Sequence, residues 1–520
     1  MNPNIAARLL ERADAHPDRE AIVSHRGGRR RSLTYAELAR RVTATAAGMR
    51  ASGVGPGGRV LLLVPMSIDL YTGLLAVMHA GGVAVFLDAW ADRRRVDAAI
   101  ALADPALFVG TPKAHLLRVL SRAARRIPRH WVVRGRSGLG RFERTADRGP
   151  ELVAERDHAL VTFTTGSSGA PKGAARSHAF LWAQHRALAE HMSLREGEVD
   201  MPTLPVFVLN NLALGVTSVI PDFDPRRPAR IDPRVIDRQI RAEAVSTVSG
   251  SPAFFERLCG WHADRQTRLP VRAVWTGGAP VFPPLARLVE KTVEGAAQVV
   301  YGSTEAEPIS GISAAELVRL SGTGGSGGVC VGLPVPEIDL KLLRPWDGPI
   351  ALGHGGLPEW EVGAGEVGEI AVAGDHVLGA YLAMPEETRR HKIREGDRVW
   401  HRTGDAARLD DGGRIWLMGR VGNRVVRAGE SWWPTPVEAA ALELTGIRHA
   451  AYLGMPDVQL GQRAILCLEA ERRRGSPVPD AEVRRVVAPA PVDEIRWFRR
   501  IPRDPRHASK TDTGKLRSQL

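Results

Sequence analysis

The sequence predicts an α/β fold: a large N-terminal domain of parallel-rich sheets with helices, a β-rich subdomain, and a small α+β C-terminal domain. Three observations predict this class. The chain has 520 residues, more than one hydrophobic core supports. Helical patterns alternate with short apolar runs up to Gly302, which is typical of βαβ units. Short strands with turn signals then follow from about Val329.

In the N-terminal part, an apolar period of three to four residues over 33–53 predicts a helix, and the run Arg59–Val64 predicts the strand that follows it. Later strand runs are GVAVFLD, ALFVG, ALVTFTT, AVSTVSG, AVWTGG and AQVVYG. Most of them end in Gly, Ser or Thr. Because ligands bind beyond the carboxyl ends of parallel strands, we expect a ligand site where these loops gather.

After about Val329 the runs PEIDLKLLRP, GEVGEIAVAG and GGRIWLMG predict a β-rich subdomain. From Gly419 onward AAYLGM, AILCLEA and DAEVRRVV carry a separate strand and helix pattern. We therefore expect an N-terminal domain over residues 1–418 and a small C-terminal domain over residues 419–520.

The composition is that of an ordinary globular protein, with 44% hydrophobic residues and a net charge of +13. The arginine clusters at 26–31 and 471–475 lack interleaved aromatic residues or zinc-ligand spacing, so we expect solvated faces and no nucleic-acid partner. The run from Gly73 to Leu87 is interrupted by His79 and two glycines, which excludes a membrane span there.

Cys259, Cys330 and Cys467 are isolated, so the sequence predicts buried thiols rather than a disulfide framework or a metal cluster. The first twenty residues lack the apolar segment of a secretory signal. Together these features favour a reducing compartment, and we expect a cytoplasmic protein.

A loop rich in Gly, Ser and Thr follows the predicted strand ALVTF and precedes the predicted helix HAFLWAQHRALAEHM. It reads TTGSSGAPKG and carries Lys172, one of only seven lysines in the chain. Free backbone N–H groups, hydroxyls and one ammonium predict a phosphate site, although Lys172 lies between Pro171 and Gly173, unlike the lysine of a Walker loop. The GTGGSG run at 322–327 follows a helix and precedes a strand, the reverse of a dinucleotide turn, so it predicts a surface loop.

Four ordered motifs resemble those of the adenylate-forming superfamily of acyl-CoA synthetases, peptide-synthetase adenylation domains and luciferases, over nearly the whole chain. They are TTGSSGAPKG, YGSTEAEP from Tyr301, HRTGD from His401, and GRVGNRVVRAGESWWPTPVE from Gly419. The resemblance implies ATP-dependent adenylation of a carboxylic acid, ATP and Mg²⁺ as cofactors, and a mobile C-terminal domain whose tail lysine reaches the active site.

The resemblance also assigns roles to residues. Thr304 contacts the α-phosphate, Glu305 binds Mg²⁺, and Asp405 with Arg420 holds the ribose hydroxyls, while the loop after Gly277 and Tyr301 flank adenine. A carboxylate beside phosphates is useful mainly through a bound cation, which agrees with the role of Glu305. The ATP-binding residues so implied are Thr164, Thr165, Gly166, Ser167, Ser168, Gly169, Lys172, Gly278, Ala279, Pro280, Tyr301, Gly302, Ser303, Thr304, Asp405 and Arg420.

A narrower resemblance is to the β-lactone synthetases of bacterial long-chain olefin biosynthesis. The segments FVGTPKAHLLRVL, LPVFVLNNLALGVTSVIPDFDPRRPARIDP, GSPAFFERL and RVWHRTGDAARLDDGGRIWLMGR carry it. It implies a hydrophobic 2-alkyl-3-hydroxy acid as substrate, a β-lactone as product, and other enzymes of the same pathway as partners. Val426 and Gly422 stand where the superfamily has a lysine and a charged hinge residue, so we expect CoA to be dispensable.

Other functions stay open at this stage. A fatty acyl-CoA synthetase and a fatty acyl-AMP ligase would carry the same nucleotide motifs. A catalytically silent scaffold that binds nucleotide is the alternative from another class of protein.

The catalytic tail lysine has two candidates. Lys515 lies in a TGK sequence, thirteen residues after Pro502. In the superfamily pattern P-x-x-x-x-G-K the lysine follows the proline by only six residues. Lys510 fits the pattern D-x-R-H-x-x-K of the β-lactone synthetases, with Asp504, Arg506 and His507. We favour Lys510. The predicted catalytic residues are thus Lys510, Lys515, Lys172, Thr304 and Glu305.

Overall fold

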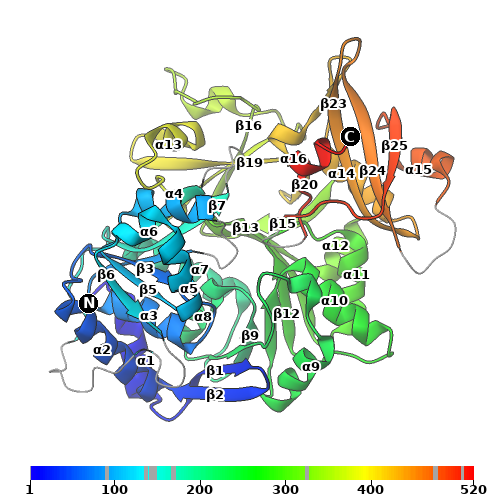
Figure 1. The fold of residues 1–520 in the computed structure, drawn as a ribbon. Helices are drawn as coiled ribbons and strands as arrows, with labels where there is room; N and C mark the ends of the chain where they lie inside the picture. The colour runs from blue at the N-terminus through cyan, green and yellow to red at the C-terminus, as the bar shows by residue number, and fades with distance from the viewer. Residues whose placement is uncertain are drawn as a thin grey trace.

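The computed structural model describes residues 2–87, 93–133, 139, 149–165, 171–321, 327–471, 478–504 and 509–520. It confirms the mixed α/β class: large sheets alternate with layers of helices, and the last part of the chain forms a separate group of strands and helices at the upper right of Figure 1. The loop residues Gly166, Ser167, Ser168 and Gly169, the 322–326 part of GTGGSG, and Arg506 and His507 lie outside the described residues.

One sheet has six strands. Its order is β6 (Arg129–Val132), β5 (Leu107–Gly110), β3 (Arg59–Leu63), β4 (Val83–Phe86), β7 (His158–Thr165) and β8 (Pro171–Ser177). All neighbours pair in parallel except β7 and β8, which are antiparallel. The predicted parallel βαβ arrangement is confirmed here.

A second sheet has 14 strands among the described residues. Its order is β16 (Asp339–Leu343), β17 (Gly368–Ala373), β19 (Arg398–Leu409), β20 (Ile415–Arg420), β15 (Val329–Pro334), β14 (Ala306–Ser313), β13 (Ala296–Ser303), β12 (Ala273–Gly277), β11 (Thr247–Gly250), β9 (Val199–Pro202), β10 (Thr217–Ile220), β1 (Glu20–Arg26) and β2 (Arg29–Thr34), with β18 (Lys392–Glu395) paired to β19. From β13 to β1 the strands are parallel. Beyond β13 they are antiparallel, so the predicted β-rich part continues the same sheet.

Helices cover both sheets and fill the space between them. A shared apolar core joins the two sheets through α1 (Ala7–Ala15), α2 (Tyr35–Ala51), α3 (Ile68–His79), α7 (His178–Met192) and α8 (Pro205–Leu214). The outer face of the six-stranded sheet packs against α4 (Arg93–Ala103), α5 (Pro112–Leu120) and α6 (Arg122–Arg126). The outer face of the second sheet packs against α9 (Pro233–Ala242), α10 (Pro252–Ala263), α11 (Pro283–Thr292) and α12 (Ala314–Ser321).

The end of the chain has its own small core. It contains the hairpin β21 (Val425–Arg427) and β22 (Glu430–Trp432), the sheet β23 (Ile447–Asp457), β24 (Gly461–Ala470) and β25 (Glu494–Phe498), and the helices α14 (Pro434–Leu442), α15 (Asp480–Val487) and α16 (Thr513–Arg517). Strand β20 runs to Arg420, so the boundary predicted after Met418 falls within this strand. The domain boundary and the mobility of the C-terminal part stay predictions.

The sequence analysis missed strand β8. It placed the loop with Lys172 directly before the helix at His178, but residues 171–177 form a strand between them. PKGAARS has no β-branched or aromatic residue, and its first six residues are buried. A Cβ on Gly173 would come 3.1 Å from the Cβ of Leu382, so small residues here allow a neighbouring segment to approach closely.

Candidate active site

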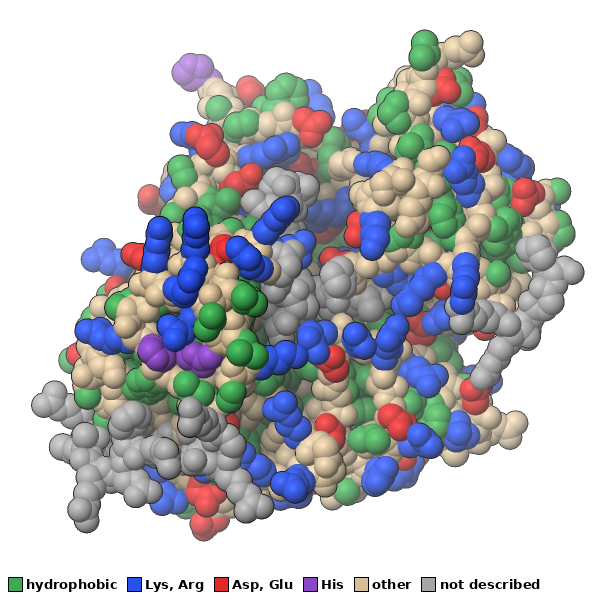
Figure 2. Space-filling model, in the orientation of Figure 1, with side chains coloured by type: hydrophobic (Ala, Val, Ile, Leu, Met, Phe, Trp, Pro, Cys, Tyr) green, Lys and Arg blue, Asp and Glu red, His purple; other side chains and the backbone are tan. Residues whose placement is uncertain are grey.

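A cavity of about 2060 Å³ opens where the two sheets and the C-terminal part meet. Figure 2 shows a recess between the upper left part of the molecule and the C-terminal group at the upper right. The predicted site residues that line it are Thr164, Lys172, Gly278, Ala279, Pro280, Tyr301, Gly302, Ser303, Thr304, Glu305, Asp405, Arg420 and Lys510. Thr165 ends strand β7. Motifs separated by hundreds of residues in sequence therefore border one cavity.

Thr304 and Glu305 form the two-residue turn between β13 and β14, where Ser303 pairs with Ala306. The Glu305 carboxylate accepts hydrogen bonds from Tyr381 Oη at 2.9 Å and from Thr164 Oγ1 at 3.5 Å. Its backbone oxygen accepts one from the amide of Leu378 at 2.7 Å, and Arg176 Nη2 donates to the Thr304 carbonyl at 2.7 Å. The turn is thus held from several sides before any ligand binds.

Gly302 precedes this turn, and its lack of a side chain is required by the packing. A Cβ there would come 3.0 Å from the Ala306 carbonyl oxygen and 3.2 Å from Glu307 Cα. Both contacts are tighter than backbone atoms normally allow, so a larger residue would displace the turn. Glycine therefore helps to fix where Glu305 lies.

Lys172 is buried in β8, with 4% of its surface exposed. Its Nζ forms an ion pair with Glu387 Oε2 at 2.6 Å and donates to His391 Nε2 at 2.7 Å, both in α13 (Pro385–His391). It also lies 5.4 Å from the ring centroid of Tyr381. Burial and the adjacent Lys172 charge lower the pKa of His391 to about 4, so this imidazole is neutral and accepts the hydrogen bond.

Asp405 and Arg420 face each other across the β19–β20 ladder, and their side chains are paired at 2.9 Å. Tyr301 Oη donates to the other carboxylate oxygen of Asp405 at 2.8 Å. Burial, followed by the charge of Asp405, raises the pKa of Tyr301 well above its usual value, so the phenol stays protonated. Each oxygen of Asp405 keeps lone pairs that can accept from ribose hydroxyls.

The loop from Gly278 to Pro280 follows β12, next to the strand that carries Tyr301. Gly277 pairs with Val300 in the parallel register, and a Cβ on Gly277 would come 2.5 Å from the Val300 carbonyl oxygen. Gly278 then adopts a φ of +81°, which favours glycine. The close approach of these two strands places the loop beside Tyr301, as the predicted adenine pocket requires.

The tail brings one of the two candidate lysines to the cavity. Lys510 lines it, whereas Lys515 lies in α16 and is not among the described lining residues. The Asp504 amide donates to the Lys510 carbonyl at 2.8 Å, and Ser509 Oγ accepts from the amide of Ala253 in α10 at 3.1 Å. The Ser509 contact attaches the Lys510 segment to the N-terminal part. The catalytic role of either lysine stays a prediction.

The sequence analysis missed several residues of this region, among them Tyr381, Glu387 and Lys392. Lys392 is buried, donates to the Leu378 carbonyl, and lies 5.3 Å from the ring centroid of Tyr381. Burial lowers the pKa of Lys392 to about 7, against the opposing effect of Glu305. The scarcity of lysine was a usable signal, since Lys392 is one of seven, but it matches no motif that the sequence analysis used.

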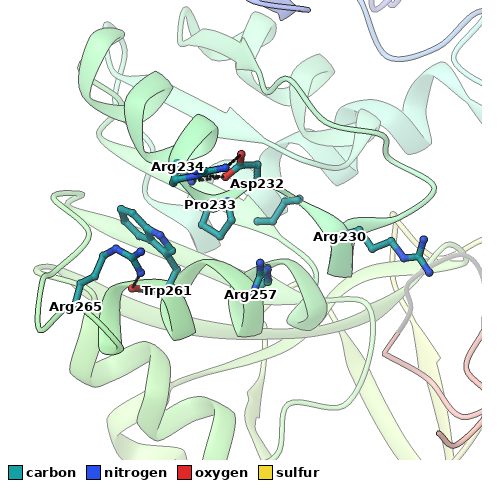
Figure 3. Close-up of a pocket in the computed structure, with 8 residues that line it drawn as sticks. Arg230, Asp232, Pro233, Arg234, Arg257, Trp261 and Arg265 are labelled. Atoms are coloured by element: carbon teal, nitrogen blue, oxygen red, sulfur yellow. Dashed lines mark hydrogen bonds and ion pairs between the residues drawn. The ribbon is translucent and has the colours of Figure 1, made fainter. Parts of the chain in front are cut away.

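A second hollow of about 420 Å³ lies between the start of α9 and helix α10 (Figure 3). Arg234 is paired with Asp232 at 2.9 Å there, and the Arg265 guanidinium lies 4.4 Å from the Trp261 ring centroid. None of the predicted nucleotide residues lines it in the described part of the chain. The predicted chemistry therefore belongs to the larger cavity.

Three further features of the described residues concern metal binding, the cysteines and the possibility of a membrane-spanning helix. Within the described ranges, no group of three or more His, Cys, Asp or Glu side chains could hold a metal ion. Cys259, Cys330 and Cys467 are buried and free. No described helix has the length and apolar character needed to cross a bilayer.

Comparison with known proteins gives a consistent result. The sequence model of the family described as AMP-binding enzyme matches residues 9–382. An olefin beta-lactone synthetase of Stenotrophomonas maltophilia is 34% identical over 549 aligned positions, which cover 99% of this chain and 97% of that protein. Another from Xanthomonas campestris pv. campestris is 35% identical over 497 positions, which cover 90% and 87%. ATP-bound MatB from Rhodopseudomonas palustris matches in fold, with a TM-score of 0.81, 23% identity and coverage of 100% and 99%.

Replacing Glu387 by Gln should strengthen ATP binding about threefold to tenfold, because a phosphate then displaces a neutral amide from Lys172 instead of a carboxylate. Isothermal titration calorimetry measures the effect. Glu386→Gln is the matched control, since Glu386 is exposed and pairs with Arg389 on the same helix. Weaker ATP binding in Glu387→Gln alone would mean that Glu387 positions Lys172 for the nucleotide.

The low pKa of Lys392 predicts a pH-dependent stability. Between about pH 7 and 10.5 the unfolded chain holds the proton that the folded protein has released, so the free energy of unfolding rises with pH across this window. Lys392→Met lacks this contribution. Its melting temperature relative to wild type should therefore be highest near pH 7 and fall toward pH 9.5.

Differential scanning fluorimetry of both proteins across that range measures the difference. Lys291→Met is the control, because Lys291 is exposed at the end of α11. Parallel pH profiles for wild type and Lys392→Met would show that Lys392 titrates as a solvated lysine.

Proposed function

The chain belongs to the AMP-binding enzyme family and is an adenylate-forming ligase that activates a carboxylic acid with ATP, and we propose that this acid is a long-chain 2-alkyl-3-hydroxy acid which it converts to a β-lactone. The observation that carries the proposal is the continuity of the cavity. One wall holds the nucleotide motifs, and apolar side chains line a large part of the rest.

The apolar walls come from several elements of both sheets. Leu63 and Phe86 end strands β3 and β4, Leu117 comes from α5, Leu209 from α8, and Phe223 from the segment after β10. Small-molecule sites typically occupy about 300–1,000 Å³. A volume of about 2060 Å³ leaves room for a nucleotide and a long hydrocarbon chain together.

In the first half-reaction a substrate carboxylate oxygen attacks the α-phosphorus of ATP, and the bond to the bridging oxygen of pyrophosphate breaks. Negative charge builds on the phosphoryl oxygens. Lys172 and Lys510 line the cavity and supply positive charge to this transition state, while Arg176 holds the Thr304 backbone in place.

Glu305 fits the role of a Mg²⁺ ligand. It is a single carboxylate beside the phosphate motif, and Mg²⁺ in nucleotide enzymes is held by one or two carboxylates together with substrate phosphates and water. When bound, the ion neutralises phosphate charge and favours departure of pyrophosphate. The hydrogen bond from Tyr381 orients the Glu305 carboxylate for this role.

In the second half-reaction the 3-hydroxyl oxygen of the acid attacks the acyl carbon, and the bond to AMP breaks. The hydroxyl proton passes to solvent and AMP leaves. The nucleophile is already tethered two carbons away, so no second substrate must be recruited. Identities of 34% and 35% to two olefin beta-lactone synthetases support this acceptor. Val426, at a position where the superfamily has lysine, is consistent with a reaction that needs no CoA.

The product distinguishes this proposal from its alternatives. With ATP, Mg²⁺ and a long-chain 2-alkyl-3-hydroxy acid, and without CoA, we expect a compound with the mass of the acid less one water, formed together with AMP and pyrophosphate. Mass spectrometry detects it. The corresponding acid without its 3-hydroxyl group is the matched control, which should form the acyl-adenylate and no lactone.

Two results would replace the proposal. A thioester formed at the rate of pyrophosphate release, with no product unless CoA is present, identifies an acyl-CoA synthetase. An acyl-adenylate that accumulates from both acids, with no lactone, identifies a fatty acyl-AMP ligase.

Lys510→Ala should slow adenylation on the order of 10²-fold, the usual loss when one charge-stabilising donor is removed, while ATP affinity changes little. Lys515→Ala is the matched control in the same tail and should retain activity, since Lys515 does not line the cavity in the described structure. The measurement is ATP–pyrophosphate exchange. Loss of exchange in Lys515→Ala alone would assign the catalytic role to Lys515.

A further inference from the structure

Helix α5 exposes apolar side chains beside the cavity. Leu116, Val119 and Leu120 are 67%, 59% and 63% exposed. They are neighbours on one surface helix and have no group that can hydrogen-bond to water. Contiguous exposed aliphatic side chains of this kind usually mark an interaction surface, whereas single ones do not.

Basic side chains surround these residues. Over residues 111–133 the sequence has no Asp or Glu, and its exposed cations include Lys113, Arg122, Arg125 and Arg126. Within the described part of the chain no carboxylate forms an ion pair with any of these four cations. Figure 2 shows Lys and Arg side chains gathered where α4, α5 and α6 lie. We define the α5 face as these four cations together with Leu116, Val119 and Leu120.

The same helix also borders the cavity. Thr111 caps its start, Ala114 is buried, and Leu117 lines the cavity while it packs on the outer core. Leu116 and Leu120 lie on the adjacent side of the helix, which is exposed. One helix therefore separates the apolar walls of the cavity from the exposed α5 face.

We propose that the α5 face docks the protein on an anionic lipid surface. Exposed aliphatic side chains insert at the boundary between headgroups and acyl chains, and each nearby Lys or Arg adds roughly 1 kcal/mol of attraction to acidic lipids. Hot spots of protein–protein interfaces are enriched in Trp, Tyr and Arg, whereas Leu and Val are under-represented there. The α5 face has arginines, but its exposed apolar side chains are Leu and Val and it includes neither Trp nor Tyr, which fits lipid better than an acidic protein.

Docking in this orientation would place the cavity wall that α5 forms, with Leu117, next to the phase in which a long-chain acid dissolves. This consequence rests on the proposed function, but the docking itself does not. It can therefore be tested without ATP or acid, and its failure leaves the proposed function untouched.

Vesicle co-sedimentation tests the proposal, with phosphatidylcholine vesicles that contain phosphatidylglycerol and with phosphatidylcholine vesicles alone. The wild type should bind the anionic vesicles only, and salt should release it. Leu116→Ser with Leu120→Ser should lower the partition coefficient about tenfold. Arg122→Glu with Arg125→Glu and Arg126→Glu should lower it on the order of a hundredfold or more.

Two matched variants separate the α5 face from general charge and hydrophobicity. Arg29→Glu with Arg31→Glu and Arg40→Glu makes the same charge change on other exposed arginines, and Leu333→Ser removes another exposed leucine. Both should bind vesicles like the wild type. ATP–pyrophosphate exchange with a short water-soluble acid should be unchanged in every variant, which shows that each one folds.

Three outcomes would overturn the proposal. The first is a wild type that ignores anionic vesicles, and the second is an equal loss of binding in the two arginine triple variants. The third is tight binding of soluble polyglutamate together with leucine substitutions that weaken binding neither to polyglutamate nor to vesicles. That result would identify an electrostatic site for an acidic protein.

Discussion

The arrangement of the site depends on the segment 377–381, which joins the two sheets. Val377 forms a β-bridge with Ala306 of the 14-stranded sheet, and Tyr381 forms one with Ala174 of the six-stranded sheet. Between these bridges the Leu378 amide and the Tyr381 hydroxyl both bind Glu305. The strand that carries Lys172 and the turn that carries Glu305 come from different sheets, and this segment fixes the distance between them. Small residues in β8, which fit the close approach of the segment, are part of the same constraint.

The region around Tyr381 contains more buried charge than a structural core would normally hold. The ammonium groups of Lys172 and Lys392 lie 5.4 and 5.3 Å from the same ring centroid, with Glu305 and Glu387 as nearby carboxylates. Two buried cations so close together cost free energy unless anions offset them. A nucleotide triphosphate is an anion that could offset this positive charge. Burial is the main cause that keeps His391 neutral and lowers the pKa of Lys392, and the charge of Lys172 acts in the same direction on both.

Local sequence patterns predicted the elements that depend on residues close together in the sequence. The apolar runs that became β3, β4, β5, β12 and β13 were recognisable because a buried parallel strand is mostly apolar. The motif residues were recognisable because glycine, hydroxyl and carboxylate groups at fixed spacing have few other uses.

Strand β8 was missed because its small residues serve a contact with Leu382, some two hundred positions later in the chain. Glu387 and Lys392 were missed for the same reason, since their partners, Lys172 and Tyr381, are set by tertiary packing. Spacing alone also could not decide between Lys510 and Lys515, because the difference between them is which one the tail presents to the cavity.

The position of β1 in the second sheet has a consequence for how the chain folds. Residues 20–26 pair with β2 on one side and with β10 on the other, where Ile22 lies opposite Ser218. During synthesis the N-terminal hairpin therefore has one unpaired edge until the ribosome has released residues beyond 220. An open strand edge can pair with the wrong chain, and contacts this distant in sequence form slowly. Strand β1 is therefore made early but completes its pairing only when β10 has been made. Folding of this part must wait for the middle of the chain.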